Sequence, residues 1–299
     1  MSFTPASTLV ADTRPTDGDS RHGSSHLGGD QILVPLLTPD RATVSDQLRA
    51  AASFGRTTGG SLHVVNPATA SRGDEFDLRQ EFTAGDEQQL LEWAMDHAPE
   101  GGPGPRGDGF AYTRGLLRGI LGTIETTEID TLVVPSGSQT GLVRRGLVDR
   151  LALRAECDVI TVNGQHGYGT VPSILLPVAG GPHSGLATDV ADRIGADFDA
   201  WIDVLHVVDP DAPDRRREQA RAHVDAAAQR IGRPESTSTW VLESPDVADA
   251  IVEQSQYYGL TVVGAPTKGR LRRFIAGSTN RQIRSNAHSV VLSARNNRA

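Results

Sequence analysis

Short apolar runs alternate with longer amphipathic segments along most of the chain. The run Gln31–Leu37 is bounded by turn residues, which predicts a buried strand. Helical spacing of apolar residues follows from about Pro39 to Thr57, and a second apolar run, SLHVVNP, occupies 61–67. Strands that alternate with helices of this length favour parallel pairing and right-handed crossovers. The pattern therefore predicts an α/β, Rossmann-like fold with helices on both faces of a parallel sheet.

The same order of segments occurs twice. ILVP at 32–35 returns as ILLP at 174–177, and LHVVNP at 62–67 returns as LHVVDP at 205–210 with almost the same offset. Two later pairs correspond as well: LVVPS at 132–136 with VVGA at 262–265, and DVITVN at 158–163 with SVVLSA at 289–294. Repetition at a fixed spacing indicates a tandem duplication.

Each copy reads as five strands with intervening helices, so we expect two tandem, doubly wound, five-stranded parallel sheets. In the second copy the predicted strands lie near 173–178, 201–208, 237–243, 260–264 and 289–294, and the predicted helices near 183–195, 213–231, 246–258 and 278–287. The predicted boundaries are a disordered tail at 1–30, an N-terminal domain at 31–163, a linker at 164–172 and a C-terminal domain at 173–299.

A less regular segment separates the second and third strands of the first copy. Residues 74–98 have a helical pattern, whereas the Pro- and Gly-rich stretch APEGGPGPRGDG at 98–109 predicts a flexible connection.

Composition narrows the class of protein. The formal net charge is −8 and the pI is about 5.6, which argues against nucleic acid as a partner. The only cysteine, Cys157, cannot form an internal disulfide, and no apolar run approaches the roughly 18 residues of a membrane span. The first 30 residues lack the apolar stretch of a secretion signal. We therefore expect a soluble, cytoplasmic protein without membrane insertion.

The stretch VVGAPTKGRLRRFIAGST at 262–279 joins a predicted strand to a Gly-Ser-Thr sequence that could open a helix. In a doubly wound sheet, ligands bind beyond the carboxyl ends of the strands, where the strand order reverses. The loops after ILLPV, LHVVD and VVG begin in that neighbourhood. Backbone N–H groups, hydroxyls and the positive end of a helix dipole at 277–279 are suited to an anion.

With these segments, the chain from Gln31 onward resembles a tandem universal stress protein of the UspA superfamily. The resemblance implies an ATP site, in which G-x-x-G-x9-G-(S/T) follows the fourth strand and an acidic residue follows the first. In the second copy, Gly264, Gly277 and Ser278 match this pattern, whereas Thr267 replaces the second glycine and Ala179 stands at the acidic position. The motif is therefore partial.

The candidate nucleotide-binding residues are Gly264, Thr267, Lys268, Gly277, Ser278, Thr279 and Ala179. Lys268 and three arginines make this loop cationic, so that it could pair with phosphates. Equally, the same charges could belong to a solvated surface loop. Thr267 adds a Cβ where backbone approaches phosphate, and Ala179 cannot accept a hydrogen bond from a ribose or base.

The first copy departs further from the motif. Its loop begins with Pro135 and Ser136, Gly146 is followed by Leu147 instead of a hydroxyl residue, and Leu37 replaces the acid. We expect this degenerate copy to be structural.

Other polar residues have simpler explanations. His63 and His206 occupy equivalent points in the LHVV repeats, but no further ligand is spaced to join them, which favours packed histidines over a metal site. Ser184 is explained as a helix cap. Asp209 and Asp211 could approach a ligand or Mg²⁺, although turn acids beside a proline are more common. No nucleophile and base pair emerges, so no catalytic residue is predicted.

The leading hypothesis is a non-enzymatic stress-response regulatory protein that binds ATP, with or without Mg²⁺, in its C-terminal domain. The alternative is an interaction module that binds no nucleotide and regulates a protein partner such as a transporter. A weak ATP hydrolase ranks last. In the family, the last strand commonly pairs two domains, so the strands at 158–162 and 289–294 are expected to meet, either within the chain or by self-association.

Overall fold

The structure is a computed structural model that describes residues 31–66, 84–99, 106–110, 115–136, 142–163, 169–265, 282–283 and 286–298. The predicted tail at 1–30 lies outside the described residues, as do most of the predicted linker and most of the helix expected over 278–287.

Ten strands form one sheet, in the order β3-β2-β1-β4-β5-β10-β9-β6-β7-β8. The N-terminal half contains β1 (Gln31–Pro35), β2 (Ser61–Asn66), β3 (Arg106–Phe110), β4 (Thr131–Pro135) and β5 (Asp158–Asn163). The C-terminal half contains β6 (Ser173–Pro177), β7 (Trp201–Val208), β8 (Thr237–Glu243), β9 (Leu260–Gly264) and β10 (Val290–Arg295). Within each half all pairs are parallel. The predicted fold class is therefore confirmed, with the two five-stranded sheets merged into one.

The two final strands join the halves. β5 and β10 pair antiparallel, with Leu292 opposite Val162 and Ala294 opposite Ile160. Of the two arrangements expected for these strands, the structure has the one within the chain, and both of their edges are occupied by neighbouring strands.

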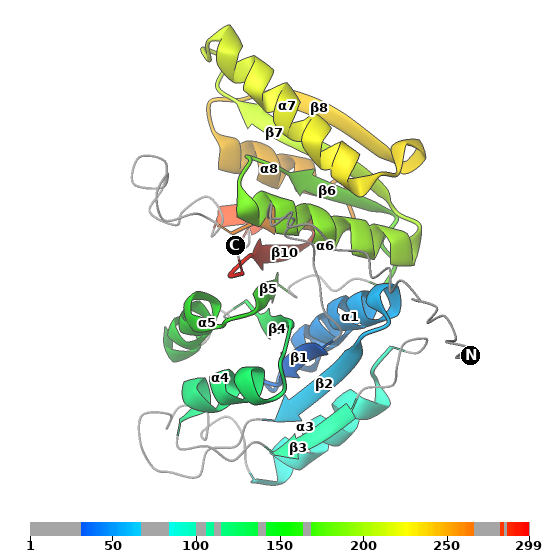
Figure 1. Cartoon of the computed structure of the whole chain (residues 1–299), viewed down its shortest axis with the longest axis vertical. Helices are drawn as coiled ribbons and strands as arrows, with labels where there is room; N and C mark the ends of the chain where they lie inside the picture. Colours follow the sequence, from blue (N-terminus) through cyan, green and yellow to red (C-terminus); the bar gives the residue numbers. More distant parts are fainter. Residues whose placement is uncertain are drawn as a thin grey trace, which may run out of the picture.

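Helices cover both faces of the sheet (Figure 1). They are α1 (Arg41–Thr58), α3 (Ala84–Asp96), α4 (Leu116–Thr126), α5 (Leu142–Arg154), α6 (Pro182–Phe198), α7 (Asp214–Ile231) and α8 (Val247–Ser255), with a short 3-10 turn, η1, at Pro234–Ser236. On one face, α1 packs against α6 across the boundary between the halves, with α3 and α7 on the outside. On the other face, α4 and α5 cover the N-terminal half and α8 the C-terminal half.

The sequence pattern predicts a third strand in the N-terminal half but does not give its position. Residues 106–109 of β3 belong to the stretch expected to be a flexible connection, and β3 pairs with β2. Strand pairing uses backbone groups, so two glycines do not prevent it at the edge of a sheet. The pairing is irregular, with a register shift between Val64 and Asn66.

The repeated LHVV motif is not in structural register. Pro35 is opposite Val65, whereas the equivalent Pro177 is opposite Leu205, so the two LHVV runs are displaced along their strands. An odd displacement reverses the face on which a side chain lies. His63 and His206 are consequently not equivalent, which corrects the expectation from the sequence.

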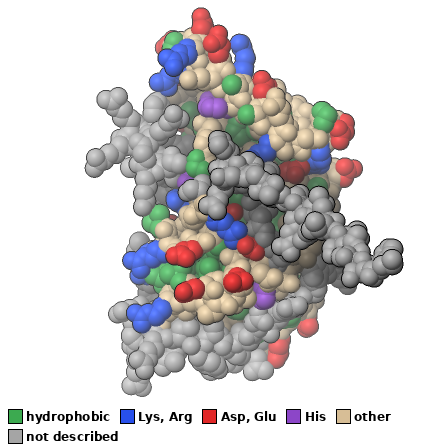
Figure 2. Space-filling model, viewed as in Figure 1, with side chains coloured by type: hydrophobic (Ala, Val, Ile, Leu, Met, Phe, Trp, Pro, Cys, Tyr) green, Lys and Arg blue, Asp and Glu red, His purple; other side chains and the backbone are tan. Residues whose placement is uncertain are grey.

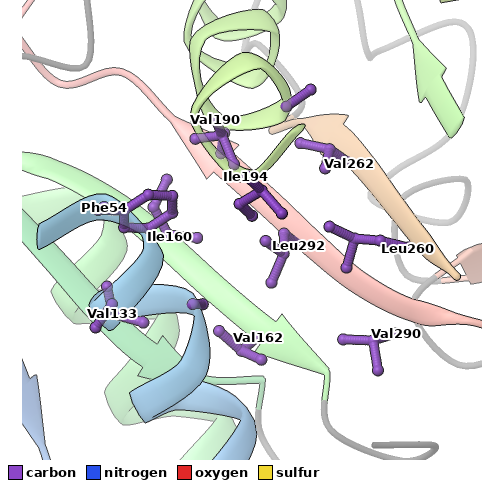
Figure 3. Close-up of a cluster of buried hydrophobic side chains, with 14 of the residues drawn as sticks. Phe54, Val133, Ile160, Val162, Val190, Ile194, Leu260, Val262, Val290 and Leu292 are labelled. Atoms are coloured by element: carbon purple, nitrogen blue, oxygen red, sulfur yellow. The ribbon is translucent and has the colours of Figure 1, made fainter. Parts of the chain in front are cut away.

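A continuous apolar core underlies the contact between α1 and α6. Phe54, which is 1% exposed, projects from α1 toward Ile160 of β5 and toward Val190 and Ile194 of α6, while Leu292 lies between the halves (Figure 3). On the opposite face, each half has its own hydrophobic cluster, separate from that of the other half. The packing of α1 against α6 therefore fixes the position of one half relative to the other.

Polar contacts at the edge of this core also cross between the halves. Asp197 of α6 accepts hydrogen bonds from Ser53 Oγ at 2.7 Å and from Arg56 Nε at 2.6 Å, both on α1. Burial raises the pKa of Asp197, but the hydrogen bonds from Arg56 and Ser53 lower it further, so that the pKa lies below its ordinary value. The ion pair is partly buried, since the side chain of Asp197 is 9% exposed.

We expect Asp197→Ala to lower the free energy of unfolding by about 1 to 3 kcal/mol, because it leaves Arg56 without its carboxylate at a partly buried position. Urea denaturation followed by circular dichroism measures this change. Asp225→Ala, at an exposed position on α7, is the control and should change stability by less than about 0.5 kcal/mol. Equal effects of both variants would contradict the assigned role of the pair.

Residues after β10 fasten the C-terminal segment to the N-terminal half. Asn297 Nδ2 donates to the carbonyl oxygens of Ala152 and Ala155, both at 3.0 Å, and Arg298 donates to Asp130 Oδ1 at 2.6 Å. Asp158 lies beneath this segment and is 2% exposed. Burial raises its pKa to about 6, and the nearby Arg298 only partly offsets that effect.

Asp158→Asn should remove a pH dependence of stability. A carboxyl group with a raised folded pKa stabilises the fold fully below its unfolded pKa of about 3.9, and this contribution is lost as the pH rises to the folded pKa of about 6. We expect the stability of the wild type relative to Asp158→Asn to fall by about 2 kcal/mol between about pH 4.5 and pH 7.5. Urea denaturation of both proteins at the two pH values gives this difference, and a constant difference would refute it.

Candidate functional site

The strand order of the C-terminal half reverses between β6 and β9, which are neighbours in the sheet. Their carboxyl ends lead into the loops that begin at Val178 and Ala265. Val178 N donates to Leu205 O at 2.8 Å, which holds the first of these loops against β7. A ligand of such a sheet is expected where these two loops begin, and we call this place the β6–β9 site.

Two predicted site residues, Ala179 and Gly264, border the β6–β9 site. Ala179 is exposed, and its N–H donates to Ser184 Oγ at 3.2 Å. Gly264 ends β9 against the first turn of α6, where an added Cβ would lie 2.8 Å from the carbonyl carbon of His183 and 3.0 Å from Ser184 N. Close packing of strand and helix is therefore sufficient reason for a glycine at 264.

The start of α6 has an open, glycine-rich geometry. Gly180 and Gly181 have φ values of 78° and 88°, which favour glycine. Gly181 is the N-cap and offers no side chain to cap the helix, and Pro182 is the first helical residue. The prediction of Ser184 as the cap is wrong, because Ser184 lies within α6 and its hydroxyl donates to Gly180 O at 3.1 Å. This arrangement presents the positive end of a 17-residue helix beside the β6–β9 site.

The matching place in the N-terminal half is closed. Leu37, at the position of Ala179, is 3% exposed and belongs to the core under α4 and α5. The start of α1 is capped by Asp40, whose carboxylate accepts from Thr43 N at 3.3 Å. Gly146, the counterpart of the motif glycine, lies inside α5 and not at its start. In the N-terminal half, the Asp40 carboxylate thus caps the helix start, and Leu37 is buried. In the C-terminal half, the equivalent helix start has no side-chain cap, and Ala179 is exposed.

Two histidines lie beside the glycine loop. The ring centroids of His206 on β7 and His223 on α7 are 5.3 Å apart. A Cβ at Gly180 would lie 2.7 Å from His223 Nε2, so glycine makes room for this ring. Among the described residues, neither Nδ1 atom has a hydrogen-bond partner. Burial and the neighbouring His223 lower the pKa of His206, which favours its neutral form.

A third histidine connects the site to the C-terminal segment. His183 Nδ1 accepts a hydrogen bond from Asn296 N at 3.1 Å. Burial, together with the nearby Arg295, lowers the pKa of His183. His183 is therefore a neutral hydrogen-bonding group that ties the first turn of α6 to the residues after β10.

Sequence reasoning did not identify His223 or Asn296. His223 is a lone histidine in a long polar helix, so the sequence contains no signal of its contact with Gly180. Asn296 follows the last strand and is equally inconspicuous. Both contacts depend on how distant elements pack, which a local motif does not record.

The remaining predicted site residues lie outside the described residues; they are Thr267, Lys268, Gly277, Ser278 and Thr279. The structure therefore brings Ala179 and Gly264 together and describes neither the cationic loop nor the Gly-Ser-Thr sequence.

The other polar candidates have structural roles. The acids after β7 form a turn, in which Asp211 N donates to Asp209 Oδ1 at 2.8 Å. His63 is 6% exposed, and its Nε2 lies 2.6 Å from Gln31 Oε1. No group of three or more metal-binding side chains occurs in the part of the chain that the structure describes.

A groove of about 660 Å³ lies elsewhere, beside α4 and α5 of the N-terminal half. Its lining includes the charged residues Arg118, Glu125, Arg150, Arg154 and Glu156. Charges of both signs line it, and none of the predicted nucleotide-binding residues is among them. The groove is therefore separate from the β6–β9 site.

Cys157 has the wrong environment for a nucleophile. It is fully buried, and burial raises the pKa of its thiol to about 12, so the thiolate is not formed near neutral pH. None of the described helices combines the length and the apolar character that crossing a bilayer requires.

Comparison with known proteins places these features in a family. Residues 171–295, which contain the β6–β9 site, match the sequence model of the Universal stress protein family. This part of the chain is therefore a domain of that family. A comparison with curated protein sequences found no match.

Solved structures share the fold of both halves. A universal stress protein from Archaeoglobus fulgidus DSM 4304 is 12% identical, with a TM-score of 0.57, and the match covers 90% of this chain and 97% of that one. The cytoplasmic domain of a prokaryotic cation chloride cotransporter is 13% identical, with a TM-score of 0.55, and the match covers 89% of this chain and 95% of that one. At these identities the likeness establishes the fold alone.

Gly264→Ala should lower the free energy of unfolding by about 1 to 3 kcal/mol, because its Cβ would press on the backbone of α6. Gly122→Ala is the matched control. Gly122 lies in the middle of α4 with nothing within 4 Å of an added Cβ, so alanine there should raise stability by about 0.5 to 1 kcal/mol. Thermal or urea denaturation measures the change in stability of both variants. A change of the same sign in both would contradict the packing role of Gly264.

Proposed function

We propose that this protein is a cytoplasmic universal stress protein that binds ATP in its C-terminal half and acts by regulation, without catalysis. The observation that carries the proposal is the contrast between the halves: the start of α6 has no side-chain cap, whereas Asp40 caps α1. An uncapped helix start at the strand-order reversal suits a phosphate group. The family match over 171–295 supports the same assignment.

In this proposal the N-terminal half is a second, diverged domain of the same family. Support comes from its strand order, which repeats that of the C-terminal half, and from a universal stress protein fold that matches 90% of the chain. Its buried Leu37 and capped α1 suit a structural role. ATP, with or without Mg²⁺, would be held by Gly277 and Ser278 of the motif and by the backbone near Gly181.

A second candidate is an interaction module that binds no nucleotide and regulates a protein partner. Ala179 favours it, since neither this residue nor Leu37 offers the carboxylate that family members often direct to the nucleotide. The fold shared with the cytoplasmic domain of a transporter is compatible with this role. A nucleic-acid partner is not favoured, because the formal net charge is −8 and basic and acidic side chains are interspersed on the face shown in Figure 2.

The nucleotide proposal predicts a gain of affinity in one variant. Ala179→Asp places an acceptor at an exposed position of the β6–β9 site, and a charge-assisted hydrogen bond to ribose or base should strengthen ATP binding about tenfold or more. Isothermal titration calorimetry with ATP and Mg²⁺ measures the affinity. Ala179→Leu, which adds volume without an acceptor, should give no gain.

Two further measurements complete this test. Ser278→Ala should weaken ATP binding, because the proposal assigns the hydroxyl to a phosphate. Natively purified protein that is then denatured should release a nucleotide. If the wild type is empty, ignores added ATP and is unchanged by Ala179→Asp, the nucleotide proposal fails and the interaction module takes its place.

A further inference from the structure

One end of the ten-stranded sheet has an open, regular edge. Within the described residues, β8 has one neighbour, β7, and pairs with it through every position from Thr237 to Glu243 without a register shift. The strand TSTWVLE contains neither proline nor lysine. Natural edge strands usually carry such residues or a bulge, which hinder pairing with another chain.

The other end of the sheet has those protective features. β3 is five residues long, contains Gly107 and Gly109, and pairs with β2 through an irregular register. The two ends of one sheet are therefore built differently, and β8 is the end suited to accept another strand.

Apolar side chains adjoin the β8 edge on the face that carries α8. Trp240 and Leu242 of β8 are partly buried there, packed against the core under α8. Alternation along β7 places Trp201 on the same face as Leu205, and Trp201 is 44% exposed. An exposed aromatic side chain beside the unpaired edge of a strand is typical of an interaction surface.

We propose that β8 pairs antiparallel with β8 of a second copy of this chain, about a two-fold axis at Trp240. In this register Thr239 lies opposite Val241 of the second copy, and Glu243 lies opposite Thr237. No like charges face each other, and the segment is complementary to itself, as an isologous interface requires.

The neighbouring registers are less favourable. An axis at Thr239 would leave Leu242 and Glu243 without partners in the opposing strand, because residues 235 and 236 belong to η1. An axis at Val241 would leave Thr237 and Ser238 without partners in the opposing strand. The axis at Trp240 is therefore the one that pairs the whole strand without charge repulsion.

A second copy fits this surface better than a single peptide strand would. A two-fold axis perpendicular to the sheet keeps the same face of both copies on the same side. The two Trp240 rings would then be cross-strand neighbours, and the apolar side chains beside α8 would form one continuous surface. A peptide would satisfy the backbone of β8 but would supply no matching apolar face.

The first experiment is sedimentation velocity of the purified full chain at micromolar concentrations. We expect the wild type to sediment as a dimer, with twice the 31.8 kDa mass of one chain. Thr239→Lys, an exposed edge substitution, should weaken dimerisation about tenfold or more, because it places a charge opposite Val241 of the second copy. Gln229→Lys, at an exposed position on α7, is the control and should remain dimeric.

Cysteine cross-linking tests the register. A Thr239→Cys, Val241→Cys double variant should form a disulfide-linked dimer under mild oxidation, because residues 239 and 241 of the two copies are directly opposite. Thr239→Cys alone should cross-link much less, and the buried Cys157 should not react. A monomeric wild type, or a dimer that tolerates Thr239→Lys and does not cross-link in the double variant, would overturn the proposal.

Discussion

The antiparallel pairing of β5 with β10 is the contact on which the rest of the structure depends. It turns two five-stranded sheets into one sheet of ten, and it brings α1 and α6 together on one face. The central core then forms between them, with Phe54 directed at residues from both halves. Because this core is continuous, neither half has a complete apolar interior on that face without the other.

The pairing also explains where the polar contacts between the halves lie. Since β10 runs opposite to β5, its carboxyl end reaches the amino end of β5. Asn297 and Arg298 can therefore contact the end of α5 and Asp130, while Asn296 contacts His183 at the β6–β9 site. The C-terminal segment thus links the candidate site to the N-terminal half through a short series of hydrogen bonds.

Much of the fold is predictable from the sequence because buried parallel strands appear as apolar runs. The strands of the C-terminal half begin and end close to their predicted limits, and the tandem repeat correctly indicates two similar halves.

β3 is not predictable in the same way, since an edge strand relies on backbone pairing and its glycines resemble a loop. The LHVV repeat misleads for a related reason: sequence similarity does not determine register, and β2 and β7 pair with their neighbours at different offsets. Contacts at the candidate site are harder still, because His223 meets Gly180 only through the way α7 lies across β7.

The antiparallel pairing of β5 with β10 also determines how far apart the equivalent loops of the two halves lie. The carboxyl ends of the N-terminal strands open on one rim of the sheet and those of the C-terminal strands on the opposite rim, separated by a strand length of roughly 20 Å. A small molecule on one rim cannot touch the other. Leu37 can therefore be buried in the N-terminal core without altering the geometry at Ala179, so that the two rims can carry different chemistry.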